Sequence, residues 1–417
     1  MHDVIMPEAA TGPGHRLKLG MAEFIALAAS LAAVAAMSID ILLPALPAIG
    51  ETFGVADPNS RQLVILVYVV TFSVSQLFFG LLTDRYGRRP FLIFGLALYL
   101  AGSVAAIFSN SFETLLAMRV VQGVGTAALQ VVVMAVIRDC FSGQSMGRVL
   151  TFVFTTFMIV PIVAPSIGQA IQYVSGWRGV FVFNAIAGSA LFAWAYLRLE
   201  ETLSHDARRA ISFENVFDAL KQIATNRITA GYAIASMATF VGLFAYVVSV
   251  QQVYGEAYGL GELFALAFGA SSIGVAAAAL CSARLVRMFG IRQVAHGALL
   301  LFTASGLTLS ALSLAAVPPF WVCFLFLSIC MMAFGVLQGN FNAMALEPQG
   351  HIAGVASSLY GVVTMTVGSI GGGLVGQAYD GTPTPLALAF GLGGVIASLV
   401  ILWTRKGRLF RAIRPTA

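Results

Sequence analysis

The sequence predicts an all-α membrane protein with about twelve transmembrane helices in two six-helix halves. Three observations lead to this fold class. Hydrophobic residues make up 59% of the 417 residues and charged residues only 10%, against roughly 25% charged residues in a soluble domain. The apolar runs are continuous and about twenty residues long, which is the length a helix needs to cross a bilayer. One long polar segment, 199–226, divides these runs into six and six.

This composition excludes other classes of protein. A soluble protein must cover its exterior with polar residues, so we expect neither a soluble enzyme nor a disordered chain. An outer-membrane barrel would alternate apolar and polar residues over about ten positions, and the runs lack that pattern. Lipid offers no partners for backbone polar groups, so each run is predicted to be a helix.

The predicted spans form an N-terminal bundle, 23–198, and a C-terminal bundle, 227–404. Duplicated halves of six helices are a transporter architecture. The two halves show a weak sequence similarity: Gln122-Gly123 in span 4 resembles Gln338-Gly339 in span 10. The spans are 23–48, 62–83, 91–109, 114–138, 147–172, 178–198, 227–254, 262–286, 292–314, 319–345, 352–378 and 384–404.

The segments outside the bundles are polar. The N-terminal tail, 1–22, lacks the apolar core and cleavage site of a signal peptide, so span 1 is expected to remain in the mature protein. The C-terminal tail, 405–417, is basic. In the linker, 199–226, apolar residues recur at helical spacing from Phe213 to Ile223. This pattern predicts an amphipathic helix on the inner membrane surface, with a flexible linker as the alternative.

The basic residues predict the orientation. With a cytoplasmic N-terminus, all but three of the 23 Lys and Arg residues fall on the cytoplasmic side, as the positive-inside rule requires. The exceptions are Arg61, Arg119 and Arg178. Both termini are therefore expected in the cytoplasm, with the chain in the inner (plasma) membrane. Basic loops next to anionic lipid also explain the pI of about 9.1 without a nucleic-acid partner.

No cofactor or metal is expected. The four cysteines form no disulfide or metal-binding pattern. The five histidines lie outside the spans or near their ends, so no cluster at one depth suggests a membrane-embedded enzyme. The sequence has no Gly-x-x-x-x-Gly-Lys-Ser/Thr segment, which disfavours an ATP-driven pump. A receptor or purely structural role would leave Asp40 and Arg119 unexplained.

The most specific motif joins spans 2 and 3. Within it, Gly80 would permit close helix packing, Gly87 a tight turn, and Asp84 a favourable contact with a helix N-terminus. Its arginines are expected to pair with acidic groups at neighbouring cytoplasmic ends, of which Asp139 is the candidate. The alternative is that they only anchor the loop in the cytoplasm. The motif reads Gly80-Leu81-Leu82-Thr83-Asp84-Arg85-Tyr86-Gly87-Arg88-Arg89.

Two charged residues lie inside spans. Asp40 in span 1 and Arg119 in span 4 are predicted at similar depth, which would bring carboxylate and guanidinium together as a proton-coupling pair. Gln122 lies one turn from Arg119 on the same face. Intramembrane charges are costly and usually mark function. The alternatives are a polar cap for Asp40 and an arginine that reaches backbone carbonyls.

These segments resemble the major facilitator superfamily, and the chain is similar to its bicyclomycin/chloramphenicol-resistance (Bcr/CflA) drug:proton antiporters. The loop after span 2 resembles the superfamily signature, and Arg119-Val120-Val121-Gln122-Gly123 resembles the antiporter Arg-x-x-Gln-Gly segment. Pro161, Pro165 and Gly168 in span 5 resemble its antiporter segment, although their spacing departs from the commonest Gly-Pro form.

The resemblance implies two halves that rock around a central cavity, with the loop after span 2 as a cytoplasmic gate. The gate residues would be Gly80, Asp84, Arg85, Gly87, Arg88, Arg89 and Asp139. Spans 1, 4, 7 and 10 would line the cavity. The candidate cavity residues are Asp40, Arg119, Gln122, Tyr246, Gln252, Gln338, Asn340 and Asn342.

The sequence thus predicts a proton-coupled secondary exporter of small amphipathic organic compounds or drugs. Its expected partners are a small-molecule substrate, protons and membrane lipid, and it is expected to act as a monomer. The alternatives within transport are a proton-coupled importer and an exporter of one endogenous metabolite.

Overall fold

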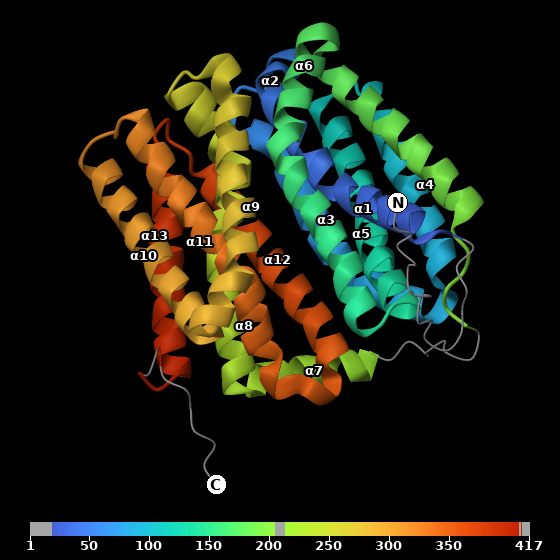
Figure 1. The fold of residues 1–417 in the computed structure, drawn as a ribbon. Coiled ribbons are helices and arrows are strands. Elements are labelled where there is room, and N and C mark those ends of the chain that lie inside the picture. Colours follow the sequence, from blue (N-terminus) through green and yellow to red (C-terminus); the bar gives the residue numbers. More distant parts are fainter. Residues whose placement is uncertain (1–18, 205–212, 408–409, 411–417) are drawn as a thin grey trace, which may run out of the picture.

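The computed structural model describes residues 19–204, 213–407 and 410. These ranges are mostly helical and contain no strand, which confirms the predicted all-α membrane class. Eleven segments are long and apolar enough to cross a bilayer. One of them, α6 (Gly143–Arg198), has 56 residues and reverses at Gly176, where φ is +68°. Its two arms make up the predicted spans 5 and 6, so the described residues contain twelve helical segments of the kind that can cross a bilayer. Figure 1 shows how they are arranged.

The N-terminal half is built from long helices with defined ends. The side chain of Ser111 accepts a hydrogen bond from the Thr114 N–H at 3.2 Å and caps α5. Gly87, with φ of +111°, separates α3 from α4. The elements are α1 (Met21–Asp40), η1 (Leu43–Ala45), α2 (Leu46–Phe53), η2 (Pro58–Gln62), α3 (Leu63–Tyr86), α4 (Arg88–Ile107), α5 (Phe112–Cys140) and α6.

The C-terminal half follows helix α7 (Phe213–Thr225), which lies in the linker where the sequence predicts an amphipathic helix. Asn226 caps α8 by accepting hydrogen bonds from the N–H groups of Ile228 and Thr229. The elements are α8 (Arg227–Val250), the π-helix η4 (Gln251–Ala257), η5 (Gly261–Leu263), α9 (Phe264–Phe289), α10 (Ile291–Ala315), α11 (Phe320–Leu346), η6 (Glu347–Ile352), α12 (Ala353–Gln377) and α13 (Thr384–Thr404).

The first span is broken, whereas the sequence suggests one helix over 23–48. Helix α1 ends at Asp40, and the chain continues through η1 into α2. Pro44 and Pro47 explain the break, because proline has no N–H to donate and disfavours helical geometry in the residue before it. We call the segment from Asp40 to Pro44 the elbow.

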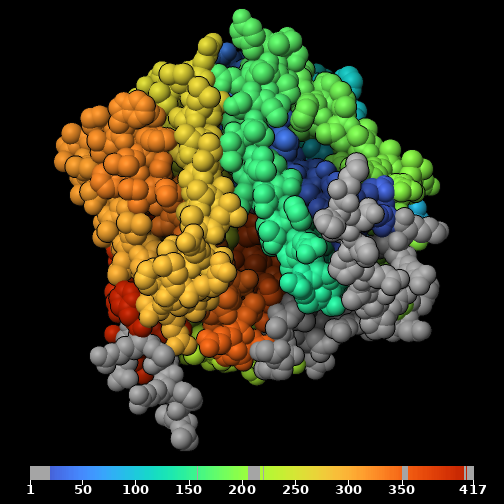
Figure 2. Space-filling model, in the orientation of Figure 1, coloured from blue at the N-terminus to red at the C-terminus, as the bar shows by residue number. Residues whose placement is uncertain are grey.

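The two halves meet through α3 on α12 and α6 on α9. We call the end of the bundle with η2 and η4 the η2 end, and the opposite end the α7 end. The largest apolar core includes residues of both halves, among them Tyr68 and Tyr246. In Figure 1, α6 and α9 lie close at the η2 end and diverge toward α7. Figure 2 shows α12 at the back of a recess between α9 and α6.

Candidate functional site

Asp40 is a buried acid at the point where the first span breaks. Its residue is 5% exposed. No described residue forms a hydrogen bond or ion pair with its carboxylate. It lies close enough to Tyr68 in α3 and Tyr246 in α8 for its charge to act on both. Asp40 therefore sits beside the contact between the two halves.

Arg119 does not pair with Asp40, so this part of the sequence prediction is wrong. Its guanidinium donates hydrogen bonds to the carbonyl oxygens of Val64 at 2.9 Å and Ser38 at 3.1 Å. It also donates to Gln122 Oε1 at 2.9 Å. The alternative suggested by the sequence, an arginine that reaches backbone carbonyls, describes these contacts.

The break in the first span explains why Arg119 turns to Ser38. In a continuous helix the Leu42 N–H would bond to the Ser38 carbonyl. Here the Leu42 N–H bonds to the Ile39 carbonyl at 3.2 Å instead. The Ser38 carbonyl is left without a helical partner in a residue that is 0% exposed, and Arg119 supplies a donor.

Arg119 belongs to a buried polar network that ties α1, α3, α4 and α5 together. Gln122 Nε2 donates to Ser103 Oγ at 2.7 Å. The hydroxyls of Ser38 and Tyr99 lie 2.9 Å apart. Arg119 and Gln122 are both 0% exposed. Their predicted place in a cavity is therefore wrong for this conformation, since both are enclosed within the N-terminal half.

The antiporter-like segment packs against the elbow. Pro161, Pro165 and Gly168 all lie in the first arm of α6. A Cβ atom on Gly168 would overlap the Ile41 carbonyl oxygen, one residue after Asp40. Only glycine permits this approach of α6 to the elbow.

The other predicted cavity residues divide between two places. Tyr246 and Gln252 are buried at the η2 end. Gln338 Nε2 donates to Thr239 Oγ1 of α8 at 2.9 Å, and Asn340 Nδ2 donates to Ser282 Oγ of α9 at 3.0 Å. Asn342 is half-buried on α11.

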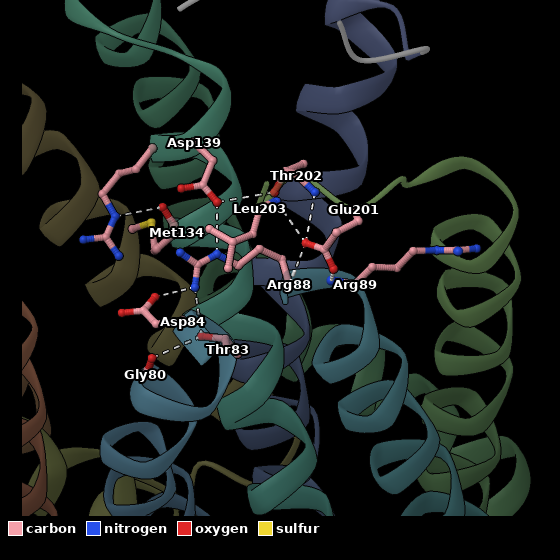
Figure 3. A network of polar contacts seen from close by, with 11 residues as sticks. Gly80, Thr83, Asp84, Arg88, Arg89, Met134, Asp139, Glu201, Thr202 and Leu203 are labelled. Carbon is pink, nitrogen blue, oxygen red and sulfur yellow. Dashed lines mark hydrogen bonds and ion pairs between the residues drawn. The ribbon is translucent and has the colours of Figure 1, made fainter. Parts of the chain in front are cut away.

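A charge cluster at the α7 end contains the residues predicted as a gate (Figure 3). Arg88 Nη1 lies 2.5 Å from Asp84 Oδ1, and Arg88 Nε lies 3.0 Å from Asp139 Oδ2. Arg88 is thus the arginine that contacts Asp139. Arg89 instead donates to the Tyr196 carbonyl at 2.8 Å, and Arg85 is exposed beside the Tyr86 ring.

Gly80 does not pack closely in this conformation. A Cβ atom there would meet nothing within 4 Å, so the expected close packing is absent here.

The corresponding region of the C-terminal half, between α9 and α10, has no aspartate at the position that matches Asp84. At the start of α10, Arg292 Nη2 lies 3.7 Å from Glu347 Oε2 of η6.

Glu201 completes the cluster, and the sequence analysis missed it. Its carboxylate accepts hydrogen bonds from the N–H groups of Arg88 at 2.8 Å and Arg89 at 3.2 Å (Figure 3). These groups at the start of α4 have no partners within the helix. A Cβ atom on Gly87 would overlap the carboxylate of Glu201. The available signals in the sequence were an acid three residues after span 6 and a glycine before span 3.

Polar contacts between the halves occur at the η2 end. Every hydrogen bond and ion pair between described residues of the two halves lies there, and each involves a residue of η2 or Gln169 in the first arm of α6. Arg61 forms an ion pair with Glu256 at 3.0 Å. The sequence analysis names Gln252 only as a cavity residue and misses this closure, because polar residues near span ends show no sign in the sequence of the partners that they meet across the halves.

Comparisons with known proteins support the resemblance seen in the sequence. The model of the Major Facilitator Superfamily matches residues 28–373. The "Uncharacterized MFS-type transporter YdgK" of Bacillus subtilis is 28% identical over 385 residues, which cover 91% of this chain and 94% of that protein. The "Bicyclomycin resistance protein homolog" of Haemophilus influenzae is 27% identical over 377 residues, covering 90% and 94%.

A solved structure shows the same fold. The human organic anion transporter MFSD10 (TETRAN) superposes with a TM-score of 0.69 at 16% identity, over 93% of this chain and 100% of that one. The resemblance to the bicyclomycin/chloramphenicol-resistance branch, first drawn from motifs, is confirmed by the sequence relatives.

Proposed function

The chain belongs to the major facilitator superfamily, and we propose that it is a proton-coupled exporter of small amphipathic organic compounds. The observation that carries this proposal is Asp40, a buried carboxylate with no hydrogen bond or ion pair to a described residue, beside the contact between the halves. The bicyclomycin-resistance relative supports drug export as the direction. Transport would proceed by alternating access, in which the halves rock around the site.

The distribution of contacts between the halves supports alternating access. They are joined by polar contacts at the η2 end, and α6 and α9 diverge toward the α7 end. With cytoplasmic termini, as the basic residues suggest, the α7 end faces the cytoplasm. The arrangement then corresponds to a transporter open to the inside, from which substrate enters.

Asp40 is placed to couple this movement to protons. The energy of an ionised carboxylate depends strongly on its solvation and on nearby charge. Rocking changes both at the elbow, so access to one side or the other would change whether Asp40 holds a proton. One pH unit supplies about 1.4 kcal/mol per proton, and 100 mV adds about 2.3 kcal/mol per charge moved.

The lack of an Asp40–Arg119 pair changes the role we assign to the arginine. Arg119 binds the backbone of α1 and α3, so we propose that it holds the elbow rather than exchanging protons. Asp40 then carries the coupling alone.

The test is transport by the purified protein in proteoliposomes and a drug panel in a strain lacking its major exporters. A resistance shift that a protonophore abolishes would support proton-driven export. Asp40→Asn should lose the pH-driven component and retain substrate binding, whereas Glu51→Gln, at an exposed position of α2, should behave as wild type. Undiminished pH-dependent export by Asp40→Asn would end the proposal, and counterflow toward the inside would favour an importer.

A further inference from the structure

We infer that Asn59 is the central residue of an outer gate, which one amide side chain closes by binding two elements of the opposite half. This inference rests on the alternating-access movement proposed above. It concerns the η2 end, which the cytoplasmic gate residues do not reach.

Asn59 uses each of its polar groups. Its Nδ2 donates to the Gln377 carbonyl at 3.1 Å and to the Tyr379 carbonyl at 2.8 Å. Its Oδ1 accepts from Gln252 Nε2 at 2.9 Å, and its backbone carbonyl accepts from Gln377 Nε2 at 3.0 Å. Its backbone N–H donates to Asp57 Oδ1 within its own half. All partners except Asp57 belong to the C-terminal half.

The partners of Asn59 are groups that need a partner from outside their helix. Gln377 is the last residue of α12. The last carbonyl groups of a helix have no N–H donor within the same helix. Gln252 lies in the π-helix η4, which continues α8. A carboxamide both donates and accepts, so one side chain of the N-terminal half can hold the ends of α8 and α12 together.

We call the contacts of Asn59 with Gln252, Gln377 and Tyr379 the clamp. Further polar contacts surround it. Arg61 pairs with Glu256 at 3.0 Å, and Gln169 Nε2 donates to the Glu262 carbonyl at 2.9 Å. The Tyr379 hydroxyl donates to the Gln252 carbonyl at 3.2 Å. Burial, with the charges of Glu256 and Asp380, raises the pKa of Tyr379 to about 12. This hydroxyl therefore keeps its proton at neutral pH, and the contact does not depend on pH there.

A hollow of about 430 Å³ lies over the clamp and is lined by both halves. Water in it can take over each hydrogen bond when the halves separate, since water can bridge or replace such polar groups. The lining residues that the two halves contribute include Asp57, Asn59, Glu256, Tyr379 and Asp380. The clamp is thus a thin polar layer between the hollow and the packed interior.

Beneath the clamp, α3 and α12 are in close contact. A Cβ atom on Gly373 would overlap the side chain of Leu66. A cysteine at Leu66 should therefore be closed to a water-soluble reagent from the η2 end while the clamp holds, and open to it when the halves part.

The experiment uses the full chain with Cys140, Cys281, Cys323 and Cys330 replaced by serine and Leu66→Cys added. The rate of reaction with a membrane-impermeant thiol reagent is measured on intact cells. Asn59→Ala should raise this rate about three- to tenfold, the change expected from losing one or two net hydrogen bonds. The matched control is Ser60→Ala, because Ser60 Oγ bonds to Asp57 within its own half; its rate should not change.

A second variant separates loss of the clamp from misfolding of the Asn59 variant. Gln377→Ala removes the other side of the same clamp, so it should raise the rate similarly and add little to Asn59→Ala. Equal rates in Asn59→Ala, Ser60→Ala and the parent, at equal expression, would overturn the inference, as would reaction only from the cytoplasmic side. The measurement follows the reactivity of a thiol and not transport, so its outcome is separate from that of the Asp40 test.

Discussion

Arg119 donates a hydrogen bond to the carbonyl oxygen of Ser38 across 3.1 Å, two residues before Asp40. This contact satisfies the carbonyl that the break in the first span leaves unpaired. The same guanidinium binds the Val64 carbonyl and Gln122. Arg119 thus ties the end of α1, two residues before the elbow, to α3 and α5.

We predict that Arg119→Ala and Arg119→Lys both destabilise the protein. Hydrogen bonds between transmembrane helices contribute about 0.6 kcal/mol on average and up to about 1.7 kcal/mol. The loss should be at the upper end, because Ser38 and Gln122 are both fully buried and solvent cannot readily replace the donor. Lysine cannot reproduce the planar fork that meets several acceptors. Thermal unfolding in detergent should show both variants melting several degrees below wild type.

The lysine variant separates positioning from charge. If Arg119 acts only through its charge near Asp40, Arg119→Lys should retain wild-type stability and transport. Retention of both would contradict the positioning role. Arg148→Lys, on an exposed part of α6, is the control for the substitution itself.

Glu201 is expected to stabilise the start of α4. Replacing a helix N-cap by alanine costs about 0.5–2 kcal/mol, and the charge of a carboxylate at this end adds about 0.3–1 kcal/mol. Glu201→Ala should therefore lower the unfolding temperature and the transport rate, with Glu201→Gln intermediate. Glu51→Gln, an exposed acid on α2, should change neither.

A substitution at Gly87 tests the contact between Glu201 and the turn before α4. Gly87→Ala combines a strained φ of +111° with overlap of Glu201, whereas Gly143→Ala has a φ of +53° and open space around its Cβ. The first should cost clearly more stability than the second. Equal melting temperatures for the two variants would show that Glu201 does not press on this turn.

The sequence predicts the helices well and their polar contacts only in part. Twelve spans follow from apolar length alone, because lipid forces each run to be helical. Span 1 is different: proline chemistry signals a break, yet the length of the run suggests one helix. The depth argument placed Asp40 and Arg119 at one height, but it assumed an unbroken span and ignored carbonyl groups, which the sequence does not display.

Contacts between segments that are distant in the sequence are even harder to predict. Glu201 meets Arg88 from 113 positions away, and Asn59 meets Gln377 from 318. Neither pair has a periodic pattern, and an isolated Asn or Glu in a loop is usually only solvated. Hydrophobic period and charge bias report what faces lipid or cytoplasm, so they carry no information about which loop lies beside which.

Gly168 is expected to be essential for the fit of α6 to the elbow. Gly168→Ala would press a methyl group on the Ile41 carbonyl, which is backbone and cannot rotate away. We predict reduced transport, with α6 displaced from Asp40. Gly147→Ala, in the same helix with nothing near its Cβ, should be neutral or stabilising by up to about 1 kcal/mol. Transport at equal expression is the measurement, and full activity of Gly168→Ala would refute the fit.

The two aspartates that share Arg88 should respond differently to loss of charge. The side chain of Asp139 is 22% exposed and that of Asp84 is 48% exposed, and half-exposed ion pairs contribute only about 0–1 kcal/mol. Asp139→Asn should therefore lower stability more than Asp84→Asn.

Asp84 has no described contact with the opposite half in this conformation. We therefore expect its charge to act when the halves close at the α7 end. An acid near a helix N-terminus stabilises by about 0.3–1 kcal/mol. That amount shifts a conformational balance without unfolding the bundle. Asp84→Asn should then insert and melt like wild type while exporting more slowly, and a wild-type export rate at equal expression would remove Asp84 from the gate.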